Sequence, residues 1–466
     1  YDIYRLSCEF AQIDLGLATS MLAVALGTDP IRVGCTEAQR RRWLPRIASE
    51  GLIVAYAVTE PEAGSNVQNV QTQAKRITDA DGNVTHYALT GVKQFISNGS
   101  IADLYTVLAK APEGPSFFIV ERGTPGLTAG KHEIKHGIRL SDTAQVLFED
   151  VVIPADQLVG QKEGEGLKQA NQVFGYTRLM VAAFGLGAGI ASLNKAIAYS
   201  KQRRQMGTLL CEKQGFTHKL LVPDSVRLAA ARAYIEYVAD LLDSGKEDRQ
   251  IEGAIAKYFA TEIGNVAADN AVQALGGYGY CVEFEVEKIR RDARILRIYE
   301  GTSEILQNIV GLYRMRESVR SKGRYYGEMA DKVEPFTDAG GPAAAKTARF
   351  LSTALDLLFH EKLGRQQHAL FECAISIAEV ETAVALVRAA GISDDPLLQA
   401  QARVCASDVA LSVPARLLKL FSSACVLEPA ALEQFSAAAD LPGAIALQAG
   451  RLADLDFIAR GITTGQ

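Results

Sequence analysis

The spacing of apolar residues changes twice along this chain of 466 residues, and this change constrains the fold more than any other feature. Residues 1–51 have the three-to-four-residue spacing of helices, with breaks at Gly27 and Pro30. From residue 52 to about 160, short β-rich runs alternate with Asp-Gly, Glu-Gly and Pro-Gly pairs, which is typical of strands and tight turns. The helical spacing returns after Glu165. The sequence therefore predicts a β domain between helical segments.

A Gly-Gly-Pro string at residues 340–342 marks a further linker, so four segments are expected. The predicted fold is α+β and mainly α, with a partial N-terminal α domain, a middle β domain, a C-terminal α bundle and an appended α-helical domain. The expected bounds are 1–51, 52–160, 161–320 and 321–466. The chain opens at Tyr1 within a helical pattern, so we expect a preceding segment that includes any targeting peptide.

Charge and cysteine spacing exclude several classes of function. A formal net charge of -5 argues against a nucleic-acid binder, which usually carries a basic excess on one face. The seven cysteines are scattered without a CxxC pair, which indicates reduced thiols, and no metal site is predicted. The histidines are interpreted as surface or core residues. No uninterrupted apolar run of about twenty residues occurs, so no spanning helix is predicted.

Four strings carry the candidate chemistry, in the order Tyr56–Ser65 (YAVTEPEAGS), Lys93–Gly99 (KQFISNG), Gln273–Gly279 (QALGGYG) and Ile298–Ile305 (IYEGTSEI). Together they resemble acyl-CoA dehydrogenases, and the resemblance covers about residues 1–312. It implies an FAD-dependent enzyme of fatty-acid β-oxidation that desaturates a fatty acyl-CoA to the trans-2-enoyl-CoA. A base removes the proton next to the thioester carbonyl, and a hydride passes from the neighbouring carbon to flavin N5.

The resemblance assigns the catalytic base to Glu300. It also implies substrate contacts at Tyr299, Gly301 and Arg178. A carboxylate acts as such a base where apolar surroundings raise its pKa and where hydrogen bonds stabilise the developing enolate. A solvated glutamate at a helix end is the alternative interpretation of Glu300. The glycine and hydroxyl residues beside it favour a turn that presents the side chain instead.

The first two strings supply the expected contacts to the flavin ring, because the ring needs polar partners at its edge and a flat apolar surface. The resemblance implies that these contacts are made by Thr59, Ser65, Phe95 and Ser97, and that Ser65 also contacts substrate. Many relatives have Trp and Thr where this chain has Phe95 and Ser97. On its own, Phe95 is equally well interpreted as an ordinary core aromatic.

The ADP half of FAD carries a pyrophosphate, which favours backbone N–H groups and a cation. The residues that the resemblance implies here are Arg203, Gln214, Gln273, Gly276, Gly277, Thr302 and Glu304, with Arg203 and Gln214 reaching across a homodimer interface. A solvated arginine is the alternative for Arg203, because Arg204 stands beside it and the register is open. Relatives often have Gln in place of Glu304, and a carboxylate does not favour a phosphate neighbour.

The extension beyond residue 320 resembles the tail of very-long-chain acyl-CoA dehydrogenases, which implies contact with a membrane surface. The segment Val413–Leu427 has the composition of an interfacial helix, although its pattern more often marks a core helix. Further implied properties are an acyl-CoA substrate, an electron-transferring flavoprotein as acceptor, and a place in the mitochondrial matrix, at the inner-membrane face or in a bacterial cytoplasm. Two alternatives stay open, an acyl-CoA oxidase and a non-catalytic assembly or scaffold protein on the same fold.

Overall fold

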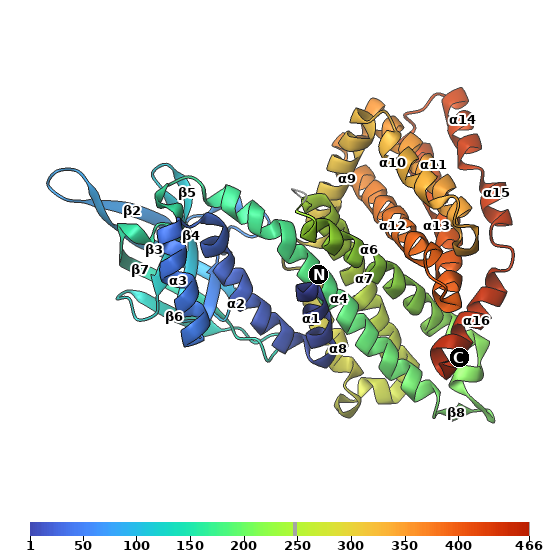
Figure 1. The fold of residues 1–466 in the computed structure, drawn as a ribbon, viewed down its shortest axis with the longest axis horizontal. Helices are drawn as coiled ribbons and strands as arrows, with labels where there is room; N and C mark the ends of the chain where they lie inside the picture. Colours follow the sequence, from blue (N-terminus) through green and yellow to red (C-terminus); the bar gives the residue numbers. More distant parts are fainter. Residues whose placement is uncertain (246–248, 466) are drawn as a thin grey trace. The chain divides into compact units, whose positions relative to one another are not determined.

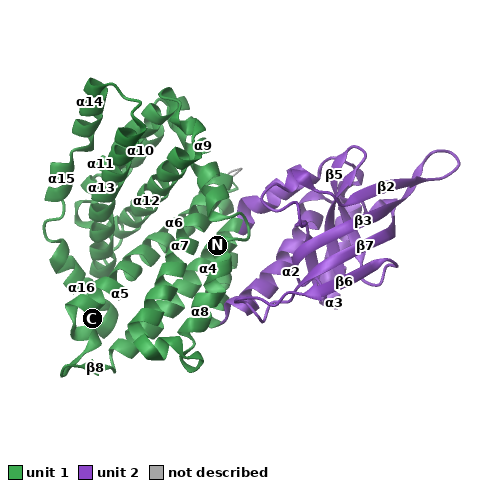
Figure 2. Cartoon of the chain, turned by 180° about the vertical axis from the view of Figure 1, so that it is seen from behind, with its two compact units in different colours: residues 1–13, 178–466 green, residues 14–177 purple. Residues whose placement is uncertain are grey.

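The computed structural model describes residues 1–245 and 249–465 and divides into two compact units (Figure 2). Unit 1 combines Tyr1–Ile13 with Arg178–Gln466, and unit 2 is the continuous stretch Asp14–Thr177. These units cut across the four predicted segments, because the first thirteen residues of segment 1–51 belong to unit 1 and the rest to unit 2. The four-part division therefore stays a prediction. The predicted α+β fold, mainly α, is confirmed.

Unit 2 is built on a seven-stranded sheet and the helices α2 (Leu15–Gly34) and α3 (Glu37–Glu50) (Figure 1). The strands lie in the order β1-β4-β2-β3-β7-β6, with β5 paired to β4. Most neighbours are antiparallel, but β4 runs parallel to both β1 and β2. The strand bounds are β1 Val54–Ala57, β2 Gln73–Thr78, β3 Val84–Ser97, β4 Leu104–Ala111, β5 Gly114–Glu121, β6 Leu127–His132 and β7 Thr143–Pro154.

The sheet has buried residues on both of its faces. Phe117 and Phe118 are neighbours on β5 and fully buried, yet they belong to two different hydrophobic clusters, because successive side chains of a strand point to opposite faces. Trp43 of α3 packs in the same cluster as Phe117. Helix α2 approaches β1 closely at Gly27, where an added Cβ would lie only 2.7 Å from the carbonyl of Val54. A larger residue at this position would push the helix away from the sheet.

Helix α3 begins at a capping box that also fastens it to the segment after β7. The Thr36 hydroxyl accepts from the Gln39 N–H at 3.3 Å, and Gln39 Oε1 accepts from the Thr36 N–H at 3.0 Å. The remaining amide group of Gln39 donates to the carbonyls of Asp156 and Leu158, both at 2.7 Å. The buried side chain of Gln39 thus satisfies a backbone N–H at the start of the helix and two loop carbonyls.

Unit 1 is helical apart from a small hairpin of β8 (Arg204–Gln205) and β9 (Thr208–Leu209) (Figure 1). Helix α4 (Gly166–Ser200) belongs to unit 2 up to Thr177 and to unit 1 from Arg178. The other helices are α1 Asp2–Ile13, α5 Gln214–Leu220, α6 Val222–Asp243, α7 Gln250–Leu275, α8 Val286–Ala293, α9 Ser303–Arg320, α10 Arg324–Val333, α11 Gly341–His360, α12 Gln367–Gly391, α13 Pro396–Ala424, α14 Pro429–Ala439, α15 Leu441–Ala446 and α16 Arg451–Thr464.

The appended helices share one hydrophobic cluster with the bundle. This cluster runs from Tyr4 of α1 through α6 and α7 to Ala459 of α16. The sequence predicts a separate domain after residue 320, whereas the packing places α10 to α16 in the same compact unit as α9. The pattern alone does not reveal this, because an apolar helix stripe does not specify its partner.

The apolar stripe of Val413–Leu427 faces this core. Val413, Leu417 and Phe421 of α13 are fully buried, so they are not available to a lipid surface. Among the described residues one helix, α4, is long and apolar enough to cross a membrane, and 78% of its apolar window is buried inside the protein. A core helix meets the same criteria, so α4 is weak support for a membrane span.

A buried charge network joins the bundle to the appended helices. Arg314 of α9 is 1% exposed, and its Nε donates to Oε1 of Glu381 on α12 at 2.8 Å. Its other nitrogens reach Glu252 on α7 at 3.1 Å and Glu317 at 2.6 Å. Glu381 also accepts from the hydroxyls of buried tyrosines on α6 and α10, Tyr234 and Tyr326. The three carboxylates therefore compensate the buried charge of Arg314, and the two hydroxyls donate to the buried carboxylate of Glu381.

We expect Glu381→Gln to destabilise unit 1 by roughly 3–5 kcal/mol, because removal of one partner leaves the Arg314 guanidinium poorly compensated in the core. Thermal unfolding followed by circular dichroism measures the effect. Glu334→Gln is the matched control, since Glu334 binds Arg349 on the exposed surface of the same unit and should matter little. Equal melting temperatures of the two variants would contradict the prediction.

Candidate active site

Glu300 lies in a strained turn between a 3-10 turn at Arg294–Arg297 and the start of α9. Its φ is 55° and that of Gly301 is 90°, and the first value is unfavourable for a residue with a side chain. The Thr302 hydroxyl accepts from the Ile305 N–H at 3.2 Å and caps α9. Glu300 is half-buried rather than solvated, which disfavours the helix-end alternative.

Two buried cations face this turn. Arg178 on α4 is 8% exposed, and burial lowers its pKa while Glu300 opposes this shift. Lys257 on α7 is fully buried, and its Nζ donates to the carbonyl oxygen of Gly301 at 2.7 Å. Burial lowers the pKa of Lys257 to about 7, with opposition chiefly from Glu300. The predicted base and the predicted active-site arginine therefore interact electrostatically within unit 1.

Lys257 and a second α7 residue, Glu262, were not predicted as site residues from the sequence. Glu262 accepts from the hydroxyl of Ser303 at 2.5 Å and from Arg297 Nε at 2.8 Å. Both residues stand in a mostly apolar stretch, IEGAIAKYFATEIG, where a charged residue on the buried side needs a partner. A charged residue within an apolar helical stretch is the sequence signal that could have identified Lys257 and Glu262.

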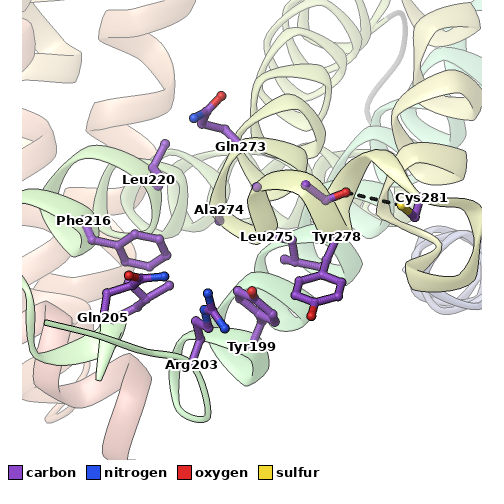
Figure 3. A pocket seen from close by; sticks show the side chains of 13 residues that line it. Tyr199, Arg203, Gln205, Phe216, Leu220, Gln273, Ala274, Leu275, Tyr278 and Cys281 are labelled. Carbon is purple, nitrogen blue, oxygen red and sulfur yellow. Dashed lines mark hydrogen bonds between the residues drawn. The ribbon is translucent and has the colours of Figure 1, made fainter. Parts of the chain in front are cut away.

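A cavity of about 600 Å³ opens between the end of α4, α5 and the end of α7 (Figure 3). It gathers Arg203, Gln273, Gly276 and Gly277, all predicted cofactor contacts, together with Leu275. Figure 3 shows Arg203 between Gln205 and Tyr199. A Cβ added at either glycine would meet nothing within 4 Å, so the glycines leave the backbone open to a ligand. This cradle and its arginine suit a phosphate-bearing group.

Arg203 and Arg204 differ in the structure. Arg203 lines the cavity, whereas Arg204 donates from Nη1 to the carbonyl of Gly207 at 3.2 Å within the small hairpin. Of the two arginines, Arg203 is the one that lines the cavity, and its contact with the cofactor stays a prediction.

Three other predicted cofactor residues of unit 1 do not line this cavity. Gln214 at the start of α5 donates from Nε2 to Oδ1 of Asp456 on α16 at 3.0 Å, and the same oxygen lies 3.2 Å from His218 Nε2. Thr302 caps α9 beside the base turn, and Glu304 is exposed on the first turn of that helix. The contact of Gln214 with the appended segment was not foreseen, because the two residues are 242 positions apart.

The remaining predicted residues form a second group, in unit 2. Thr59 follows β1, and its carbonyl accepts from the Gln94 N–H on β3 at 2.8 Å, which links the first two strings. Ser65 is exposed and Ser97 half-buried. Phe95 sits at an irregularity of β3 with a φ of 58° and is 62% exposed, so the core-aromatic alternative is wrong. A strained, exposed aromatic ring is a candidate ligand contact.

A buried ion pair, also missed from the sequence, holds these two strings together. Lys93 Nζ donates to Glu60 Oε1 at 2.6 Å and to the carbonyl of Leu108 at 2.6 Å. Glu60 accepts in addition from the N–H groups of Gln71 and Thr72. Burial lowers the pKa of Lys93 to about 8 against the opposing effect of Glu60. For Glu60, burial acts to raise the pKa, but Lys93 and the hydrogen bonds lower it overall.

The string His132–His136 has the HExxH form, and it was not recognised when the histidines were interpreted as surface or core residues. It begins on the last residue of β6 and continues into a loop, so its spacing does not place both imidazoles on one helix face as zinc binding of this type requires. Within residues 1–245 and 249–465, no group of three potential ligands from His, Cys, Asp and Glu is close enough to hold a metal ion.

Two family models and a curated relative that match this chain all describe acyl-CoA dehydrogenases. The model for "Acyl-CoA dehydrogenase, middle domain" matches residues 55–151, and that for "Acyl-CoA dehydrogenase, C-terminal domain" matches residues 164–312. A short-chain-specific acyl-CoA dehydrogenase of Megasphaera elsdenii is 39% identical over 309 residues, which are 65% of this chain and 79% of that protein.

Solved structures extend the comparison. An acyl-CoA dehydrogenase of Bacillus anthracis, complexed with FAD, matches with a TM-score of 0.86 and 23% identity over 98% of this chain and 84% of the other, which shows that the whole fold occurs there. A chain in a structure of the electron transferring flavoprotein of Acidaminococcus fermentans is 35% identical, with a TM-score of 0.61 over 65% of this chain and 79% of its own length.

We expect Lys93→Met to destabilise unit 2 by roughly 3–5 kcal/mol, because Glu60 would keep a buried and uncompensated charge. Trp43, the only tryptophan, lies in the core of unit 2, so its fluorescence during denaturant unfolding reports on this unit. The double variant Glu60→Gln/Lys93→Met should recover part of the loss.

Lys110→Met serves as the control, since Lys110 is exposed on strand β4 of the same sheet. If Lys93→Met unfolds at the same denaturant concentration as this control, the pair does not hold the two strings together.

Proposed function

The chain belongs to the acyl-CoA dehydrogenase family, and we propose that it desaturates a fatty acyl-CoA to its trans-2-enoyl-CoA with Glu300 as the base. One observation carries the assignment of the base. Glu300 is half-buried in a strained turn that faces the buried cations Arg178 and Lys257. A carboxylate fixed in this way can accept a proton without first losing a full hydration shell.

The first step of the proposed reaction is removal of the proton on the carbon next to the thioester carbonyl. Glu300 accepts this proton, and its own N–H is predicted to donate to the carbonyl oxygen, on which negative charge develops. Tyr299 and Gly301 flank the base and are the proposed neighbours of the thioester. Arg178, with its guanidinium close to Glu300, contributes positive charge at the same place.

FAD is the proposed cofactor and, when bound, supplies the acceptor for the hydride that leaves the neighbouring carbon. The cavity in unit 1 supports this proposal, because Arg203 offers a cation and the Gly276–Gly277 turn offers open backbone to a pyrophosphate. In unit 2, the exposed ring of Phe95 would pack on the flavin ring, and Thr59, Ser65 and Ser97 would bond its polar atoms. Gln214 is less well supported, because its amide binds Asp456.

Two further properties are proposed on the resemblance. A homodimer would let Arg203 of one copy reach the cofactor of the other. An electron-transferring flavoprotein would accept the electrons, which the similarity to a chain of the Acidaminococcus fermentans structure supports. The place of the reaction in β-oxidation is part of the same proposal.

Glu300→Gln should leave the protein yellow and able to bind acyl-CoA while it slows flavin reduction by at least about 10²–10⁴-fold, because shape is kept and the proton acceptor is lost. Stopped-flow absorbance after mixing with acyl-CoAs of graded length measures this rate. The matched control is Glu328→Gln on the exposed side of α10.

Three other outcomes are informative. Reduction of Glu300→Gln at the wild-type rate would mean that another carboxylate takes the proton. A wild-type protein that is not reduced by any chain length would support the scaffold alternative. Oxygen consumption without an added acceptor would identify an oxidase.

Arg203→Ala should weaken FAD retention by about 1.5–3 kcal/mol, one to two decades in affinity, because a charge-assisted contact to phosphate is lost. The dissociation constant of FAD is measured by titration of the apoprotein. Arg204→Ala is the matched control, since Arg204 binds within its own hairpin and should change FAD affinity little. Reversed effects of the two variants would move the pyrophosphate site to Arg204.

A further inference from the structure

The turn that carries Glu300 has a strained backbone, which contacts from outside the turn must hold. Glu300 and Gly301 both have positive φ, at 55° and 90°, and a glutamate keeps this conformation only where surrounding contacts fix it. Within the turn, Thr302 caps α9, but this bond lies after the base and does not fix Glu300 itself. Contacts from a neighbouring element are therefore needed to hold the base in one place.

Helix α7 supplies these contacts at three points. Before the base, Arg297 Nε donates to Glu262 Oε1 at 2.8 Å, and Nη2 lies 2.8 Å from Oε2. Directly after the base, the Gly301 carbonyl accepts from Lys257 Nζ at 2.7 Å. One residue past the cap, the Ser303 hydroxyl donates to Glu262 Oε1 at 2.5 Å. Lys257 and Glu262 thus hold both sides of the turn.

The burial of Lys257 makes its charge dependent on the contact with the turn. Lys257 is fully buried, so its ammonium group depends on the Gly301 carbonyl and on nearby carboxylates to offset its desolvation. The charged groups that act on it are Glu300 and Glu304 of the base segment, Glu262 of its own helix and Arg178 of α4. Movement of the turn would separate Lys257 from its acceptor, so the position of the base and the compensation of this charge are linked.

We propose that Lys257 and Glu262 are positioning residues of the dehydrogenation site, which hold the Glu300 turn in its strained conformation and keep a positive charge beside the ionised base. The proposal rests on Glu300 as the base. It extends the site by two residues that act through the turn and do not touch the thioester.

Lys257→Met removes the charge and the donor but keeps an unbranched side chain. We expect flavin reduction to slow by about 10- to 100-fold, with little change in acyl-CoA binding, because the base is displaced or mobile. The acidic limb of the kcat/KM profile should also move to higher pH, because the carboxylate of Glu300 is harder to ionise when Arg178 is the remaining one of its two buried cations. Lys257→Arg should recover part of the rate. Lys332→Met, on the exposed side of α10, is the control.

Glu262→Gln and Ser303→Ala test the second contact by smaller changes. Each should lower kcat more than it raises KM, with flavin content kept. If Lys257→Met does not fold, these two variants test whether the contacts from α7 position the base. A purely structural role would lower the melting temperature and leave the rate and pH profile of the folded protein unchanged, and that result would overturn the proposal. If Glu300→Gln itself is fully active, the proposed function has failed instead, and the two failures are distinguishable.

Discussion

The buried contact between Arg314 and Glu381 determines how unit 1 is assembled. It joins α9, which begins next to Glu300, to α12 of the appended segment, and it draws in Glu252 of α7. A guanidinium that is 1% exposed cannot stay in the core without these partners. The helices that surround the base and the appended helices are consequently parts of one structure, and a change in the appended segment can reach the start of α9 through a chain of direct contacts.

Much of the fold and part of the site could be predicted because the responsible signals are local. The change from helical to alternating spacing predicts a β segment at residues 52–160, and the strands of unit 2 lie between Val54 and Pro154. The string around Glu300 predicts a turn from its glycine and hydroxyl residues, and the structure has a turn there with φ of 55° and 90°. Arg203 and the Gly276–Gly277 pair, 73 positions apart by residue number, nevertheless line one cavity.

Other features depend on partners that the sequence does not pair. Nothing near Gln214 indicates that its amide binds Asp456, and nothing near Lys93 indicates Glu60 as its buried partner. The sequence around Phe95 fits a core aromatic and a ligand contact equally well. The difference depends on the exposure of the ring, which follows from a local irregularity of β3. The apolar stripes of the appended helices predict burial but not the surface that buries them, and this surface is the hydrophobic core of the bundle.

The division into units has a consequence for biosynthesis. Helix α1 belongs to unit 1, and its Tyr4 hydroxyl binds Glu236 of α6 at 2.8 Å across 232 positions of sequence. Unit 2 is continuous in sequence, whereas the hydrogen bond of Tyr4 must wait until α6 has been synthesised. At a translation rate of about 5–20 residues per second, this wait lasts roughly ten to fifty seconds. During that time the Tyr4 hydroxyl lacks its native acceptor, whereas Ala11 of α1 can already pack beside Gly187 of α4, so α1 gains its native contacts in two stages.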